Sequence, residues 1–80
     1  MLTTASNKVT LKNRRVLDGR TCWEFEVVRN GRIWTVTRTW SPEGHHMDEI
    51  TEKHNPTYSP CPTSPVAEAI GRMVTKFLKA

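Results

Sequence analysis

The sequence predicts a small α+β domain, in which a three-stranded antiparallel sheet packs on one C-terminal helix and a long Pro-rich loop joins the two. Three observations indicate this fold. Asn30-Gly31 separates two runs rich in aromatic and β-branched residues, an amphipathic stretch begins at Pro65, and all five prolines fall within residues 41–65. At 80 residues, the chain allows one small core and a single domain. We expect a flexible N-terminus (1–8), the sheet (9–40), the Pro-rich loop (41–64) and the helix (65–79).

The first strand is expected over residues 9–16, and its register with the next strand depends on the turn at Asp18-Gly19. A two-residue turn would place Lys12 opposite Phe25 on the core face. A three-residue loop with the glycine in the left-handed region instead brings Leu11 opposite Phe25 and moves Lys12 to the solvent face. We expect this second register, because a one-residue slip exchanges the two faces of a strand.

The second and third strands form a predicted hairpin around Asn30-Gly31. Both turn residues tolerate the positive φ of a type I′ turn, which joins strands through a two-residue loop. The resulting pairing places Trp23 opposite Arg38, an arrangement that suits a cation–π contact. The same face carries most of the apolar side chains of the hairpin and is the predicted core. Its members are Trp23, Phe25, Val27, Trp34 and Val36.

The Pro-rich loop is expected to contain little regular structure, because repeated prolines remove backbone donors and force extended geometry on the preceding residues. One short helix, at Met47–His54, is the single regular element we expect there. The segment is also acidic: one lysine against four carboxylates gives residues 41–65 a net charge of −3, whereas the whole chain carries +4. A connection this long in a small domain is either functional or mobile.

The helix is expected over residues 65–79, with Ser64 as the N-cap and Pro65 in the first helical position. Gly71 costs about 1 kcal/mol relative to Ala in a helix interior. Close approach of the sheet or of a partner would explain this glycine, and simple tolerance is the alternative. One apolar stripe with helical spacing is expected to cover the sheet. It comprises Val66, Ile70, Met73, Val74 and Phe77.

Catalysis is not expected, because the sequence contains no recognisable pairing of a nucleophile with a base and no Gly-rich phosphate loop. We expect no cofactor and no metal. His45, His46, His54 and Cys61 are suitable zinc ligands, but their spacing matches no compact finger.

The chain is expected to be cytoplasmic, with its two cysteines reduced. No apolar run approaches the roughly 20 residues that span a bilayer, and the N-terminus lacks the layout of a signal peptide. We therefore expect no membrane partner.

Two surfaces are candidates for binding. Arginines gather at both ends of the predicted sheet, where they suit the phosphates of a nucleic acid. The acidic loop combines carboxylates with an aromatic anchor and suits a basic protein groove. The basic candidates are Arg14, Arg15, Arg20 and Arg38 near the first turn and Arg29 and Arg32 at the hairpin tip, and the loop candidates are Asp48, Glu49, Glu52 and Tyr58.

A family resemblance favours the protein-binding interpretation. The run Trp23-Glu-Phe-Glu-Val-Val-Arg-Asn-Gly-Arg-Ile33, the Ser41-Pro42 break and Ala67-Glu-Ala-Ile-Gly-Arg-Met73 resemble, in layout, small phage-encoded anti-CRISPR proteins against type I systems. The resemblance implies a non-enzymatic inhibitor that blocks a nucleic-acid-handling complex, a protein or ribonucleoprotein, by stoichiometric binding. It assigns no site residues, because the group shares no site motif. The alternative is a small basic nucleic-acid-binding domain that uses the sheet and its arginine-rich ends.

Overall fold

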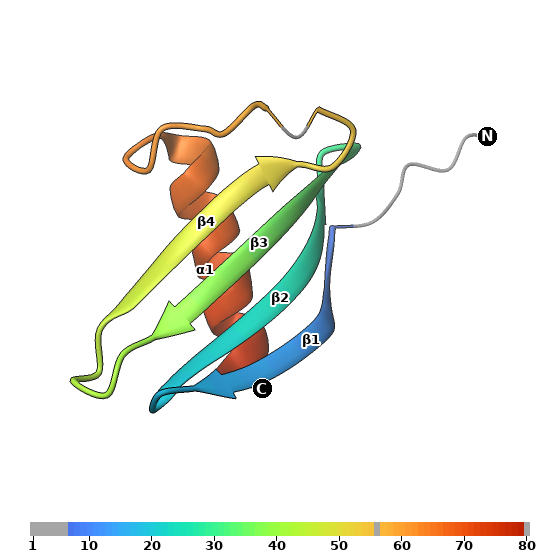
Figure 1. Ribbon diagram of the computed structural model, residues 1–80. Coiled ribbons are helices and arrows are strands. Elements are labelled where there is room, and N and C mark those ends of the chain that lie inside the picture. The colour runs from blue at the N-terminus through green and yellow to red at the C-terminus, as the bar shows by residue number, and fades with distance from the viewer. Residues whose placement is uncertain (1–6, 56, 80) are drawn as a thin grey trace.

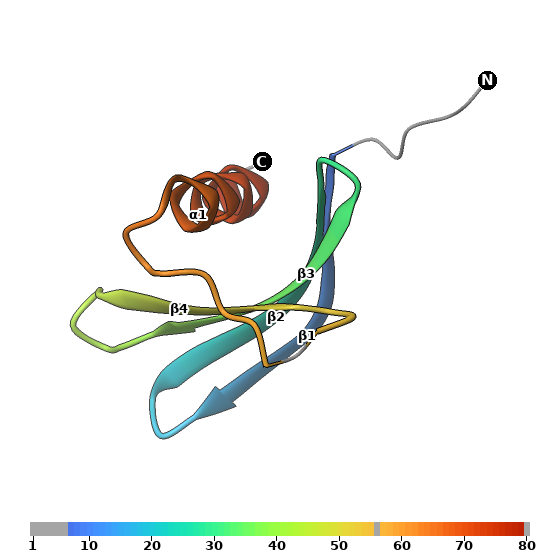
Figure 2. The ribbon, with the colours of Figure 1, turned by 90° about the horizontal axis from the view of Figure 1, so that it is seen from above.

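The computed structural model describes residues 7–55 and 57–79 and shows an α+β domain. An open antiparallel sheet of four strands, in the order β1-β2-β3-β4, is covered on its concave side by one helix (Figures 1 and 2). The α+β class is therefore confirmed, with one strand more than predicted. Within the segment expected to be a flexible N-terminus, residues 1–6 lie outside the described residues, and Lys8 already belongs to a strand. The elements are β1 (Lys8–Leu17), β2 (Arg20–Arg29), β3 (Arg32–Trp40), β4 (His46–Glu52) and α1 (Pro65–Lys79).

The β2–β3 hairpin has the predicted turn and register. Asn30 and Gly31 adopt positive φ angles of 52° and 79°, as a type I′ turn requires. Phe25 lies opposite Val36, and the pairing continues in step along both strands. Strands β2 and β3 supply half of the buried apolar core, and β4 and α1 supply the rest. The core comprises Phe25, Val27, Trp34, Val36, Ile50, Ala67, Ile70 and Val74.

The β1–β2 connection corrects one prediction. Asp18 and Gly19 form a two-residue turn with positive φ angles of 51° and 75°, and the three-residue loop was wrong. The expected pairing of Leu11 with Phe25 is nevertheless present, because a bulge between Leu11 and Asn13 absorbs the extra residue. The residue that shifts the register therefore lies within the strand rather than in the turn. A bulge there also bends the strand, in keeping with the strong curvature of the sheet (Figure 2).

The segment expected to be a Pro-rich loop contains β4, and the short helix predicted at Met47–His54 is wrong. Every residue of β4 pairs with β3. This strand was not predicted from the sequence because its inward face lacks hydrophobic alternation. Ile50 is the one apolar residue on that face, and the others are His46, Asp48 and Glu52. After β4, the chain passes back toward the start of α1 (Figure 1), and Pro60 is buried along this path.

The helix begins as predicted. The Ser64 hydroxyl accepts a hydrogen bond from the Ala67 amide at 3.2 Å, and Pro65 is the first helical residue. Phe77 corrects the core prediction: its ring meets Phe25 edge to face at 5.7 Å, yet the side chain is 39% exposed. Phe77 lies toward β1, which is an edge strand, so no further strand covers that side. Three other predicted core residues, Trp23, Val66 and Met73, are half-buried.

Candidate functional site

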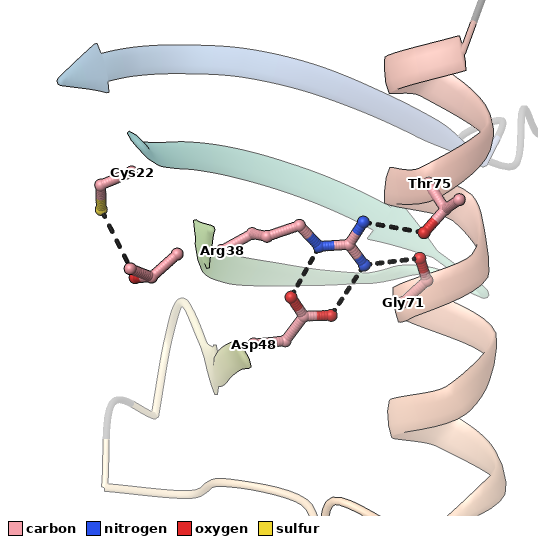
Figure 3. Close-up of polar contacts among 6 residues, drawn as sticks. Cys22, Arg38, Asp48, Gly71 and Thr75 are labelled. Atoms are coloured by element: carbon pink, nitrogen blue, oxygen red, sulfur yellow. Dashed lines mark hydrogen bonds and ion pairs between the residues drawn. The ribbon is translucent and has the colours of Figure 1, made fainter. Parts of the chain in front are cut away.

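The Arg38 guanidinium ties two strands to the helix (Figure 3). It donates from Nε to Asp48 Oδ1 at 2.7 Å and from Nη2 to Asp48 Oδ2 at 2.9 Å. It also donates from Nη1 to the Thr75 hydroxyl at 2.7 Å and from Nη2 to the Gly71 carbonyl at 3.0 Å. Arg38 is only 2% exposed, so a partner of opposite charge is needed to offset its desolvation. Asp48 supplies that charge from the neighbouring strand.

Gly71 lies where the helix approaches this ion pair most closely. A Cβ atom at this position would lie 3.3 Å from Asp48 Oδ2 and 3.8 Å from Arg38 Nη2. The first distance is tighter than ordinary van der Waals contact, so a side chain would press on the carboxylate. The structure therefore shows the close approach to the sheet that is one of the two explanations for this glycine.

Next to the ion pair, a pocket of about 450 Å³ opens where several elements end. Trp40 is the last residue of β3 and His46 is the first residue of β4. The centroids of their rings lie 4.9 Å apart, and the two ring planes make an angle of 55°. Trp23 on β2 and the last turn of α1 close the other sides. We call this hollow the Trp pocket; it is lined by Trp23, Arg38, Trp40, His46, Thr75, Leu78 and Lys79.

A shallower groove of about 610 Å³ continues from the Trp pocket along the helix. We call it the helix groove. It shares Arg38, His46, Thr75 and Lys79 with the pocket and extends past Gly71 to Arg72, Lys76 and Glu68. Its exposed rim is mainly cationic, because Arg72, Lys76 and Lys79 face solvent while Glu68 is its one exposed carboxylate.

Part of the exposed positive charge of the domain lies on the helix side, around the helix groove. Among the described residues, ion pairs within 4.0 Å engage three cations: Arg32 with Glu52, Arg38 with Asp48, and Lys53 with Glu26. The three exposed cations of the helix groove remain unpaired by this measure. Arg14 is also unpaired and lies on the same side, because it is the strand partner of Trp23.

The opposite face of the sheet carries a mixed charge. Glu24 and Glu49 point away from the helix, because both lie opposite Thr37 of β3 and the neighbours of Thr37, Val36 and Arg38, are buried on the helix side. Lys53 contacts Glu26 at 3.0 Å, and its hydrogen bond holds the pKa of that carboxyl below the usual value. Lys8, Arg15 and Arg20 are exposed on this face as well. They share it with Glu24, Glu26 and Glu49, whereas the helix groove has one exposed carboxylate. This face is therefore the weaker candidate for binding a polyanion.

The basic patch predicted near the first turn is divided in the structure, which corrects that prediction. Side chains alternate between the faces of a strand, so Arg14 lies on the helix side, whereas Arg15 and Arg20 lie on the opposite face. Arg38 is buried and bound to Asp48, hence it contributes no exposed charge and no stacking partner for Trp23. At the hairpin tip, Arg29 and Arg32 lie opposite each other.

The acidic group predicted in the loop is divided as well. Asp48 is occupied by Arg38, and Glu52 lies 3.9 Å from Arg32 with a side chain only 20% exposed. Glu49 is exposed on the face away from the helix. Tyr58 is 44% exposed and packs beside Trp34, with ring centroids 6.0 Å apart. These four residues therefore do not form one surface.

Five residues of the Trp pocket were not predicted from the sequence: Trp40, His46, Thr75, Leu78 and Lys79. Extending the hairpin register to its end would have placed Trp40 on the same face as Arg38 and Trp34. No signal in the sequence places His46 or Lys79 beside it, because both reach the pocket through the fourth strand and the docked helix.

Two further observations describe the same residues, 7–55 and 57–79. They contain no group of three or more His, Cys, Asp or Glu side chains placed to hold a metal ion. Their helix is not long and apolar enough to cross a membrane. Comparisons with protein-family models, curated proteins and solved structures found no match to this chain.

Proposed function

We propose that this chain is a non-enzymatic nucleic-acid-binding domain that contacts its ligand with the helix side. The observation that supports this proposal is the combination of an open pocket containing two half-buried tryptophans with a rim of unpaired cations. Aromatic platforms beside a positive groove are the features by which proteins bind nucleic-acid strands.

The helix cations have a spacing that suits phosphates. Arg72, Lys76 and Lys79 occupy positions i, i+4 and i+7 of α1, on one side of the helix. Seven helical residues rise about 10 Å, so the three cations can contact successive phosphates of one nucleic-acid strand. Arg14 adds a fourth cation near Trp23, at the far side of the Trp pocket.

The inhibitor hypothesis depended partly on an acidic surface in residues 41–64. In the structure, fewer of those carboxylates are free to bind a partner than the sequence suggested. Two of its carboxylates, Asp48 and Glu52, contact arginines of the same chain. A basic groove of a partner protein would have to compete with those contacts. Direct nucleic-acid binding needs no such rearrangement, and we therefore favour it. Inhibition of a nucleic-acid-handling complex stays a prediction from the layout resemblance.

The test is a fluorescence-anisotropy titration of labelled oligonucleotides at two or more salt concentrations. A variant with Arg72, Lys76 and Lys79 changed to Ala should bind more weakly, because alanine preserves the helix while the cations are lost. Its salt dependence should also flatten, by about 0.7 to 0.9 in slope for each phosphate contact removed.

The matched control removes three cations from the opposite face: Lys8, Arg15 and Arg20, all changed to Ala. The total charge is the same in both variants, so an effect of net charge alone would weaken them equally. A loss confined to the helix variant supports the proposal. Equal losses, or a wild-type chain that binds no nucleic acid, would overturn it.

A further inference from the structure

We infer that the ligand is a single strand and that the Trp pocket receives one of its unpaired bases. This inference rests on the proposed function and adds the class of nucleic acid to it. A base within a duplex is stacked on both faces and paired at its edge, so it must first be unstacked and unpaired to enter a pocket. A splayed base of a single strand can stack on aromatic side chains.

The size and position of the Trp pocket suit a planar ring. Its volume of about 450 Å³ falls within the range of roughly 300 to 1,000 Å³ found for small-molecule sites. Trp23 is paired with Arg38, and Trp40 lies two residues further along β3. Such diagonal neighbours are about 7–8 Å apart, within reach of large aromatic side chains. Both indoles line the pocket, so a base that enters it has two aromatic side chains on which to stack.

Arg38 lines the pocket and has one N–H donor that none of the described residues accepts. A guanidinium has five N–H donors, and the described residues accept from four of them. The remaining hydrogen belongs to Nη1 of a side chain that is 2% exposed and lines the pocket. Because Asp48 balances its charge, the arginine presents this donor as part of a neutral pair, which suits a base carbonyl.

The helix groove and the Trp pocket are continuous, and this continuity defines the path of the bound nucleic-acid strand. The helix groove and the Trp pocket share four lining residues, so a phosphate held by Lys76 or Arg72 lies next to a base in the pocket. Lys79 lines both hollows and is placed to contact the phosphate between them. The other polar groups near a bound base are His46 and Thr75.

The test compares an oligothymidine with a duplex of equal length by anisotropy. Wild type should bind the single strand more tightly. Trp23→Leu and Trp40→Leu should each weaken single-strand binding by about 5- to 150-fold, the equivalent of one lost stacking contact. The salt slope should stay unchanged in both variants, because no phosphate contact is removed.

Two further variants separate stacking from folding. Trp40→Phe retains an aromatic ring and should recover most of the affinity. Tyr58→Leu removes a partly exposed aromatic that packs on Trp34, outside the Trp pocket, and should leave binding unchanged. Circular dichroism and thermal melting of each variant report whether the fold is intact.

The outcomes are distinguishable. If single strand and duplex bind equally, and the tryptophan variants match wild type while the helix variant binds weakly, the pocket inference is overturned and the proposed function stands. If wild type binds neither oligonucleotide, both are overturned. If Trp40→Phe binds as weakly as Trp40→Leu with the fold intact, stacking is not the interaction and the inference is again overturned.

Discussion

Removing the Asp48 carboxylate is the sharpest perturbation of this fold. In Asp48→Ala, the Arg38 guanidinium stays 2% exposed but loses its counter-charge and two of its four hydrogen bonds. Breaking a buried ion pair in this way costs about 3–5 kcal/mol. Two hydrogen bonds to a charged group, at about 1.5–3 kcal/mol each, give a similar total.

A loss of this size is large for a domain of 80 residues. Small proteins have total stabilities of about 5–15 kcal/mol, so the variant would retain a small part of its stability. At about 4–8 °C for each kcal/mol, the Tm should fall by about 12–40 °C. Where the single variant is too unstable to purify, a double variant that removes both charges is compared with wild type instead.

The assay is urea denaturation followed by circular dichroism, with the change in midpoint converted through the slope m. Glu49→Ala is the matched control, since it removes a carboxylate from the exposed face of the same strand and should shift stability by no more than about 0.5 kcal/mol. The double variant Arg38→Met with Asp48→Leu removes both charges and should recover most of the lost stability. A stabilising role of this ion pair is refuted if Asp48→Ala is as stable as Glu49→Ala, or if the double variant is no more stable than Asp48→Ala.

Three further predictions concern single positions. Gly71→Ala should fail to stabilise α1 by the usual ~1 kcal/mol, because the alanine Cβ would press on Asp48 Oδ2. The same substitution should become stabilising in the Asp48→Ala background. A gain in stability in the wild-type background, measured by urea denaturation, would contradict this. Trp34→Ala should cost about 3–5 kcal/mol as a buried aromatic, and an unchanged thermal melt would rule out its core position. The pKa of Glu26 is lowered by the Lys53 hydrogen bond, so its stabilising contribution is present above the unfolded-state value and is lost as pH falls below about 4.5. The stability difference from Glu26→Gln should therefore shrink on acidification, and a difference that grows would show that the sign is wrong.

Local signals in the sequence were sufficient for the hairpin and the helix. The Asn30-Gly31 turn admits one two-residue geometry, and that geometry alone aligns Phe25 with Val36. The Ser64-Pro65 start is equally local, because a cap involves only the first turn of a helix. These features depend on residues close in the chain, so no knowledge of the rest of the fold was needed.

The alternation of side chains along each strand also predicted which residues share a face of the sheet. It did not predict which other elements pack on that face. Arg38 was correctly placed opposite Trp23 on the inward face. Its burial, and therefore its loss as a surface cation, depends on an acid ten residues later and on a helix more than thirty residues later. The bulge in β1 could not be predicted from local sequence either. The two-residue turn sets one register near Asp18-Gly19, the core face requires another at Leu11, and the bulge between them reconciles the two.

By itself, the sequence determined the elements whose apolar spacing or turn chemistry is complete within one segment: the hairpin, the first strand and the amphipathic helix. The tertiary structure alone decided β4 and the candidate site. The inward face of β4 carries one buried apolar residue, Ile50, so its strand character depends on pairing with β3 and on the ion pair from Asp48 to Arg38. The Trp pocket joins the ends of β3, β4 and α1, because long-range packing places together cations and aromatic rings that are distant in the chain.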